Sequence, residues 1–458
     1  MSILKDDGKS VKSRIIAITI PSVISQITNT VYAIVDRLFI GKIPNASVEA
    51  LSGIGICFPI FILISSFSQL LAVGGSTMIS MFLGDRKTKW AEKTIGNTIS
   101  LSIIVSTFLF MLLELKMKPI LIGLGASKAA FIYAHSYLKI YLFGIWFQIL
   151  IQIFASILIC QGYAYRSMLA CLISAFINIV LDYYYIFVLN KGIEGAALAS
   201  VISQIIGVAI LIVGALLLET RVKLSIRDLK IEIGICERIV RCGISSFVMS
   251  FTETCIHSVY NKSLQLYGSD IYIAAMAIIQ SLMQIIYVFS NGLTQAVQPT
   301  LSYYYGAKDT NSIKSSYRMG IVLHITIAVL GSFFLIMTRK LTASFFTNDK
   351  MFINAVCAAV PIYLAGWSIF GIQSGVQCFF VGLGKVKYSM YLAIFRKIIL
   401  LIPIMLFLPS IIGIKGVFMS EAISDTLAGI FAGILFLHKK EQMIQSPSIL
   451  EYQKSRSG

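Results

Sequence analysis

The segment that decides the fold runs from Pro21 to Gly41 and reads PSVISQITNTVYAIVDRLFIG. It belongs to the first long apolar run of the chain, and about 20 apolar residues allow a helix to cross a membrane. Asp36 lies inside this run. A carboxylate within a membrane span is costly, so it usually faces a water-filled cavity or a partner and marks a functional site. We therefore expect Asp36 to be the centre of an ion-binding site.

Composition indicates a membrane protein. Of the 458 residues, 57% are hydrophobic and 13% are charged, whereas about a quarter of the residues of a soluble protein are charged. The net charge of +17 lies mostly in the predicted loops, so we expect a lipid bilayer and no nucleic acid as partner. The eight cysteines form no CxxC pair, which argues against a disulfide framework or a zinc site.

Twelve apolar spans can be placed along the chain, which predicts an all-α membrane protein. They lie near residues 14–40, 51–75, 94–114, 131–158, 167–189, 194–218, 239–264, 272–300, 315–338, 352–379, 388–410 and 414–437. An even number of spans places both termini on the same side of the membrane. Most of the 38 lysines and arginines fall on that side, so we predict that both termini are cytoplasmic.

The second half of the chain repeats the first at an offset of about 222 residues. The segment Met81–Lys87 (MFLGDRK) is matched by Tyr303–Asp309 (YYYGAKD), and Gly192–Gly195 (GIEG) by Gly413–Gly416 (GIKG). Because six spans separate the copies, both copies insert in the same orientation. Such a duplication favours a transporter with a central site between two lobes over a receptor.

We therefore predict two pseudo-symmetric six-helix bundles. The boundaries that we expect are an N-terminal lobe at residues 1–218, a cytoplasmic linker at 219–238, a C-terminal lobe at 239–438 and a cytoplasmic tail at 439–458.

Polar residues of the N-terminal lobe are expected to converge at one depth. Asp36 lies in the outer third of the first span, and Asp182 lies in the outer half of the fifth, one helical turn from Asn178. Ser200 in the sixth span lies near the same level. Two acids at low dielectric do not both stay ionised cheaply, so the pair takes up a proton or binds a cation such as Na⁺. The alternative is that both acids are solvated and inert at the headgroup boundary.

Pro21 lies within the first span, where a proline removes a backbone hydrogen bond and kinks the helix. We interpret it as a hinge that bends further when the charge at Asp36 changes. A static kink is the alternative.

The C-terminal lobe offers candidates for a substrate cavity. Glu253 in the seventh span would form an anionic wall for a cationic substrate; the alternative is a local hydrogen bond with His257 or with a neighbouring helix. Gln280 and Gln284 in the eighth span either line a wet cavity or join helices. Glu421 and Asp425 are one turn apart in the twelfth span, and the sequence alone assigns them no role.

Signatures of enzymes are missing from the sequence. It contains no Walker motif, no nucleophile elbow and no cluster with metal-ligand spacing. We therefore expect neither enzymatic activity nor a cofactor beyond the coupling ion, which disfavours ATP-driven transport by this chain.

These features together resemble the multidrug and toxic compound extrusion (MATE) family, and within it the multidrug exporters of Gram-positive bacteria. The resemblance covers nearly the whole chain: twelve spans, two six-helix halves, and a proline followed by an aspartate in the first span. It implies a V-shaped pair of bundles that exports small organic cationic drugs from the cytoplasm across the bacterial plasma membrane in exchange for H⁺ or Na⁺, as a monomer.

The resemblance also implies roles for single residues. Pro21 matches the family's bending proline, Asp36 the acid of the first helix, and Asn178 with Asp182 the Asn-x-x-x-Asp pair of the fifth helix. Ser200 falls where relatives carry a hydroxyl that helps to hold the cation. Tyr32 and Tyr137 fit aromatic positions near that site, and Glu253 resembles the seventh-helix acid of some subgroups. From the sequence itself, we expect Asn29 of the first span to line the substrate cavity as well.

Two other functions stay open. A lipid-linked oligosaccharide flippase of the same superfamily usually has fourteen spans and a strongly cationic cavity, for which Arg396 and Lys397 in the eleventh span are the residues to examine. A channel or a receptor-like protein without coupled transport is the second alternative, and the duplication and the acids within the spans argue against it.

Overall fold

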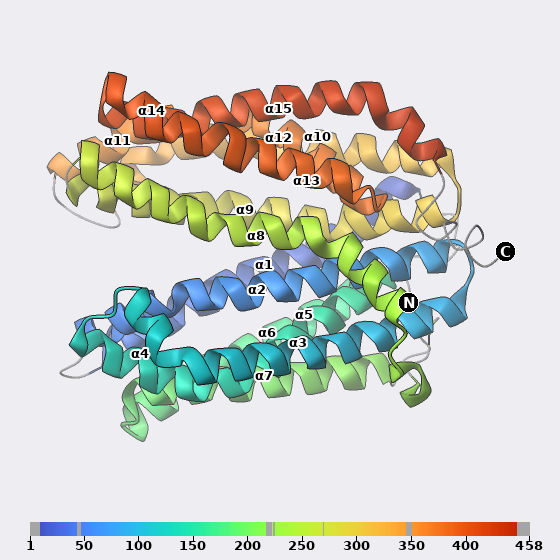
Figure 1. The fold of residues 1–458 in the computed structure, drawn as a ribbon, viewed down its shortest axis with the longest axis horizontal. Coiled ribbons are helices and arrows are strands. Elements are labelled where there is room, and N and C mark those ends of the chain that lie inside the picture. The colour runs from blue at the N-terminus through green and yellow to red at the C-terminus, as the bar shows by residue number, and fades with distance from the viewer. Residues whose placement is uncertain are drawn as a thin grey trace. The chain divides into compact units, whose positions relative to one another are not determined.

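A computed structural model of the chain describes residues 10–43, 47–216, 222, 225–268, 270–344 and 350–446. This described part is helical almost throughout and contains no strand (Figure 1). The α-helices are α1 (Val11–Ile40), α2 (Ser47–Gly84), α3 (Thr88–Gly123), α4 (Lys128–Tyr141), α5 (Ile145–Cys160), α6 (Ala164–Tyr183), α7 (Gly192–Leu216), α8 (Ile233–Tyr267), α9 (Asp270–Gly306), α10 (Thr310–Ser344), α11 (Lys350–Leu364), α12 (Trp367–Gly382), α13 (Val386–Ile394), α14 (Ile402–Ile412) and α15 (Ile414–Gln445). Four short helical segments complete the set: the 3₁₀ turns η1 (Leu142–Gly144) and η3 (Ile226–Leu229), and the π-helical turns η2 (Tyr184–Val188) and η4 (Phe395–Leu401).

Within the described residues the helices join into twelve rods, which confirms the predicted fold class. Nine stretches of the described residues are long and apolar enough to cross a membrane, and α11 with α12 forms a tenth that is bent by 48° at its break. The remaining rods, α8 and α9, are 35 and 37 residues long. Helices suit this environment because all their backbone hydrogen bonds are made within the segment.

Contacts divide the chain into two compact units. The N-terminal unit comprises Ile16–Ser250, and the C-terminal unit comprises Ser10–Ile15 with the chain from Phe251 onward. The division falls inside α8, whose first half packs against α2. Glycines allow this contact, because a Cβ on Gly243 would lie 1.8 Å from the carbonyl oxygen of Leu70, and a Cβ on Gly74 would lie 2.0 Å from that of Ile239. Small residues allow helices in membranes to approach closely in this way.

The approach to α8 is attached to α3 by side-chain hydrogen bonds. The Asn97 amide donates to the carbonyl of Lys230, and its oxygen accepts from the N–H of Glu232 at 2.7 Å. The Ser100 hydroxyl donates to the carbonyl of Leu229 at 2.7 Å. These bonds use the backbone groups that a non-helical segment leaves unpaired, and they set where α8 begins.

The internal repeat is visible in the backbone. Arg86 after α2 and Lys308 after α9 both adopt left-handed conformations, with φ of 56° and 58°. The residue that follows each of them donates a hydrogen bond five residues back, from Lys87 to Phe82 and from Asp309 to Tyr304. This is the Schellman arrangement that closes a helix C-terminus. Gly162 and Gly384, again 222 positions apart, have φ of 87° and 66°.

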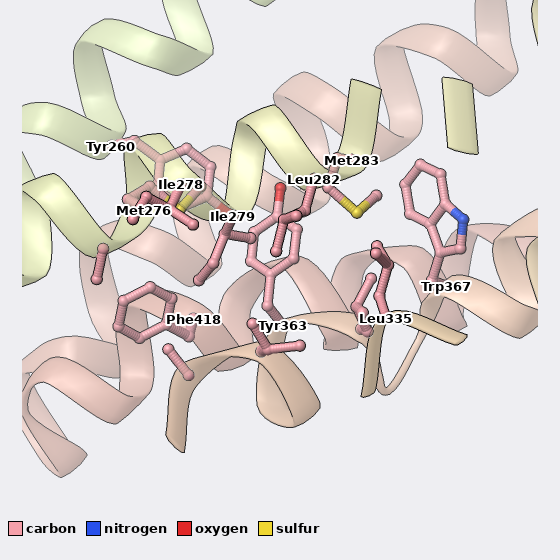
Figure 2. Packing of buried hydrophobic residues seen from close by; sticks show 14 of the residues in the cluster. Tyr260, Met276, Ile278, Ile279, Leu282, Met283, Leu335, Tyr363, Trp367 and Phe418 are labelled. Atoms are coloured by element: carbon pink, nitrogen blue, oxygen red, sulfur yellow. The ribbon is translucent and has the colours of Figure 1, made fainter. Parts of the chain in front are cut away.

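Large apolar side chains fill the C-terminal unit. Met276, Ile279 and Met283 of α9 lie beside Tyr363 of α11 in one buried cluster, to which Phe418 of α15 also belongs (Figure 2). Tyr260 of α8 is 2% exposed and lies at the edge of this cluster. A buried tyrosine hydroxyl needs a hydrogen-bond partner, and the partner of Tyr260 is a carboxylate described below.

Candidate functional site

Asp36 and Asp182 meet inside the N-terminal unit. Asp36 lies on the second half of α1 and Asp182 lies near the end of α6, and their carboxyl groups are within hydrogen-bonding distance of one another. Asp182 is fully buried and Asp36 is half-buried. The chain turns from α6 into the π-helical turn η2 two residues after Asp182, and single π turns are frequent at functional sites.

Three of the four carboxyl oxygens of this pair have no hydrogen-bond donor in the described part of the chain. Among the described residues, no N–H or O–H group donates to Oδ1 of Asp36 or to either carboxyl oxygen of Asp182, and the Asn178 amide one turn away is buried and equally without a partner. A carboxylate only accepts hydrogen bonds, so the two groups bond to each other only when one of them carries a proton. A small cation between the oxygens is the other way to offset their burial. The arrangement therefore suits a proton or a hard cation such as Na⁺.

Tyrosines of α4 border the pair. The Tyr137 hydroxyl is hydrogen-bonded to Ser200 of α7, and Asp36 is close enough to act on it electrostatically. Tyr141, one turn later, donates to Oε1 of Gln148 at 2.9 Å and is also hydrogen-bonded to Gln204 of α7. The rings of the two tyrosines stack with centroids 5.4 Å apart.

The same half of α1 presents two further predicted residues. Tyr32 lies one turn before Asp36, is half-buried, and is near both acids electrostatically. Asn29 is exposed, and its Oδ1 accepts a hydrogen bond from the thiol of Cys171 at 3.1 Å.

Pro21 is buried within α1, and the helix continues through it. Hydroxyl groups beyond the proline bond back to carbonyls four residues earlier: Ser25 to Pro21, Thr28 to Ile24 and Thr30 to Gln26. Such bonds compete with the helix ladder and often accompany bends. The helix between Pro21 and Asp36 is thus weakened at several successive turns.

A second polar cluster lies in the C-terminal unit. Arg396 of η4 donates through Nε to Asp425 at 2.6 Å and through its Nη2 to Glu421 at 2.7 Å, and all three side chains are buried. Its guanidinium carbon lies 4.1 Å from the ring centroid of Phe370. The Tyr260 hydroxyl donates to the other oxygen of Glu421 at 2.6 Å. Buried charges need this degree of pairing to be tolerated.

Glu253 is also paired. Its carboxylate accepts a hydrogen bond from the ammonium of Lys397, the residue after Arg396, at 2.5 Å. For Glu253, the sequence left open a hydrogen bond with a neighbouring helix. The bond from Lys397 of η4 is such a contact. The side chain of His257 lies outside the described residues. On α9, Gln280 is half-buried and Gln284 is exposed.

Sequence reasoning missed several members of both clusters. Tyr141 and Gln204 follow Tyr137 and Ser200 by four residues each, so helical spacing was a usable signal for them. Arg396 and Lys397 were noted as cations and Glu421 and Asp425 as an acidic pair, but nothing in the sequence joined the two sets. In the part of the chain that the structure describes, no group of three or more His, Cys, Asp or Glu side chains is placed to hold a metal ion.

Comparison with known proteins agrees with this architecture. The profile of the MatE family matches residues 21–184 and again residues 245–407, which is the predicted duplication. The chain is 25% identical over 439 residues to the multidrug export protein MepA of Staphylococcus haemolyticus (strain JCSC1435), covering 94% of this chain and 95% of that protein. It is 25% identical over 449 residues to MepA of Staphylococcus aureus (strain NCTC 8325 / PS 47), with the same coverage.

A solved structure shares the fold. It is described as the outward-facing conformation of a multidrug resistance MATE family transporter of the MOP superfamily, and it matches with a TM-score of 0.89 at 22% identity over 96% of this chain and 98% of that one. The two profile matches, which cover most of the chain, confirm the resemblance inferred from the sequence. This multi-pass membrane protein belongs to the MATE family.

Proposed function

We propose that the protein is a secondary antiporter that exports small organic cationic drugs in exchange for H⁺ or Na⁺. The observation that carries the proposal is the contact of Asp36 with Asp182, in which Oδ1 of Asp36 and both carboxyl oxygens of Asp182 have no donor among the described residues. The pair and Asn178 form the proposed coupling site, and Tyr137 holds the Ser200 hydroxyl beside it.

The coupling step is a change of one unit of charge at this pair. A proton shared between the carboxyl groups, or a Na⁺ held by them and by the Asn178 oxygen, neutralises charge that burial disfavours. Loss of that ion leaves two carboxylates in contact, which repel each other. Because they lie on different helices, α1 and α6, the repulsion favours movement of α1, and the proline and hydroxyl residues of that helix lower the cost of bending it.

Exchange also requires that the ion and the substrate each weaken the binding of the other, because coupling between two ligands is reciprocal. The relatives named multidrug export proteins support drugs as the exported compounds. Asn29, Tyr32, Glu253, Gln280 and Gln284 remain proposed substrate contacts. We further propose a monomer in the plasma membrane of a bacterial cell, with both termini in the cytoplasm.

The flippase alternative receives less support. It would require unpaired cations, whereas Arg396 lies between Glu421 and Asp425, and Lys397 is bonded to Glu253. These cations are balanced by acids and do not form a free anion-binding surface.

Efflux from proteoliposomes tests the proposal. Purified protein is reconstituted with ethidium, a cationic dye, and a pH gradient or a Na⁺ gradient is imposed separately. We expect one of the two imposed gradients to drive the accumulation of ethidium against its own concentration gradient. The variants Asp36→Asn and Asp182→Asn should abolish this accumulation. Dye movement that only equalises concentrations, whatever the gradient, would identify a channel instead.

A further inference from the structure

The ion pair of Lys397 with Glu253 is exposed on one side only. The Glu253 side chain is 43% exposed, whereas that of Lys397 is 3% exposed. The other charged members of the cluster, Arg396, Glu421 and Asp425, are at most 7% exposed. A ligand can therefore approach the carboxylate of Glu253 without first contacting the ammonium behind it.

The charges of this cluster do not cancel. Glu253, Glu421 and Asp425 are three acids, and Arg396 and Lys397 are two bases, so the five side chains in their usual ionic forms have a net charge of minus one. Oδ2 of Asp425 is buried and accepts no hydrogen bond from any described residue. These five side chains therefore favour a cation over an anion at the exposed side of Glu253.

Lys397 has a second carboxylate to interact with. Its ammonium is attracted by Glu421 as well as by Glu253, and is repelled by the neighbouring Arg396. Lys397 lies on η4, where the wider π-helical turn directs Arg396 toward α15 and Lys397 toward α8. If Lys397 loses its contact with Glu253, its ammonium thus stays near Glu421 and Asp425. These two acids together carry one more negative charge than Arg396 neutralises.

We propose that Lys397 competes with substrate for Glu253. A monovalent organic cation that binds to the C-terminal unit displaces the Lys397 ammonium from this carboxylate. On binding, the cation takes the exposed side of Glu253, and the Lys397 ammonium turns toward Glu421. Lys397 thereby determines specificity: it lowers the affinity for every cation, and it admits those whose apolar contacts compensate for the displacement. This inference rests on the proposed export of cations and deepens it.

Binding to the purified full-length protein tests the inference separately from transport. The probe is tetraphenylphosphonium, a monovalent cation with no hydrogen-bond donor, titrated by calorimetry. We expect Lys397→Met to bind it about fivefold more tightly than the wild type, the order of one partly exposed ion pair. Lys397→Arg, which keeps the competing charge, should bind like the wild type. Triphenylphosphine oxide, an uncharged probe of similar shape, should bind equally to all three proteins.

The effect must depend on Glu253. In Glu253→Gln the substitution Lys397→Met should no longer raise the affinity for tetraphenylphosphonium, because the contested carboxylate is gone. An unchanged or lower affinity in a folded Lys397→Met variant overturns the inference and leaves the proposed function intact. Absence of gradient-driven efflux in the wild type, by contrast, refutes the proposed function whatever Lys397 does.

A measurement on the wild type does not depend on the variants folding. An apolar carbodiimide joins an amine and a carboxylate that are in contact, so it should link Lys397 to Glu253, which mass spectrometry of the digested protein detects. We expect saturating tetraphenylphosphonium to lower the yield of this link severalfold, and triphenylphosphine oxide to leave it unchanged. A yield that the cation does not alter overturns the displacement.

Discussion

Asp309 and Lys87 occupy equivalent positions of the two repeats, immediately before α10 and near the start of α3, but only Asp309 caps its helix. The Oδ1 of Asp309 accepts a hydrogen bond from the N–H of Ser312 at 3.0 Å, whereas Lys87 makes no side-chain cap bond. Although partial burial opposes the charged form, the hydrogen bonds from Ser312 and Asn311 hold the pKa of Asp309 below its usual value.

This difference predicts a difference in stability. Asp309→Ala should lower the free energy of unfolding by about 1 kcal/mol, a typical value for an N-cap, and Lys87→Ala should leave it unchanged. Unfolding in detergent by denaturant measures both. Because the folded pKa is the lower one, the contribution of Asp309 is complete above the unfolded pKa of about 4 and is lost as the pH falls through the folded value. A cap contribution that grows on acidification would contradict this sign.

The coupling site predicts a loss of transport without a loss of folding. Asp36→Asn and Asp182→Asn remove the exchangeable charge but keep the size of each side chain, so gradient-driven efflux of ethidium should fall to the level of protein-free liposomes. Glu194→Gln, which changes an exposed acid at the start of α7, should transport like the wild type. Full transport by either aspartate variant, at equal expression, would remove that residue from the coupling site.

If Pro21 is a hinge, replacing it should raise the stability of α1 and lower the rate of efflux. Alanine restores a backbone donor in the helix interior, where proline is disfavoured by about 3 kcal/mol, so Pro21→Ala should stabilise α1 and slow efflux severalfold. The matched control is Pro119→Ala, an exposed proline inside α3, which should stabilise without slowing. Stopped-flow efflux with parallel denaturation separates the two effects. Equal rates for Pro21→Ala and the wild type would identify a static kink.

Replacing Arg396 should lower the stability of the protein, and neutralising the two acids that it pairs with should restore it. Arg396→Met leaves Glu421 and Asp425 buried without their guanidinium, and breaking a buried pair in this way costs about 3–5 kcal/mol. Neutralising both acids in the same chain, with Glu421→Gln and Asp425→Asn, should recover most of that loss. Denaturation in detergent compares the single variant with the triple variant. Equal stability of the wild type and the single variant would mean that the buried ion pairs do not stabilise the C-terminal unit.

Much of the architecture followed from patterns that act locally. Apolar runs of sufficient length predict helical rods whatever their neighbours, and the 222-residue repeat predicted a duplication that the profile matches at 21–184 and 245–407 confirm. The boundaries proposed at 218 and 239 stay predictions. The approach of Asp36 to Asp182 was also foreseeable, because a residue's position along a span sets its depth and the bilayer aligns the spans.

What the sequence did not predict depends on rotation of the helices about their axes. The contact of Arg396 with Glu421 and Asp425 requires that η4 and α15 face each other at one height, and hydropathy carries no such information. The π-helical turns that direct Lys397 and follow Asp182 are likewise set by packing rather than by local propensity. Depth was therefore predictable from sequence, whereas side-chain pairing was not.

The five-membered charge cluster of the C-terminal unit has an evolutionary consequence. The position of Asp425 corresponds to Ser203 in the first repeat and that of Arg396 to Ser174, and there a hydroxyl simply bonds to a backbone carbonyl at 2.8 Å. One repeat thus holds its counter-ions within the chain, whereas the proposed coupling site of the other would take its positive charge from the transported ion. Descendants that lose the arginine should lose an acid with it, so these positions should covary across homologues, whereas the first-repeat aspartates should be free of any such basic companion.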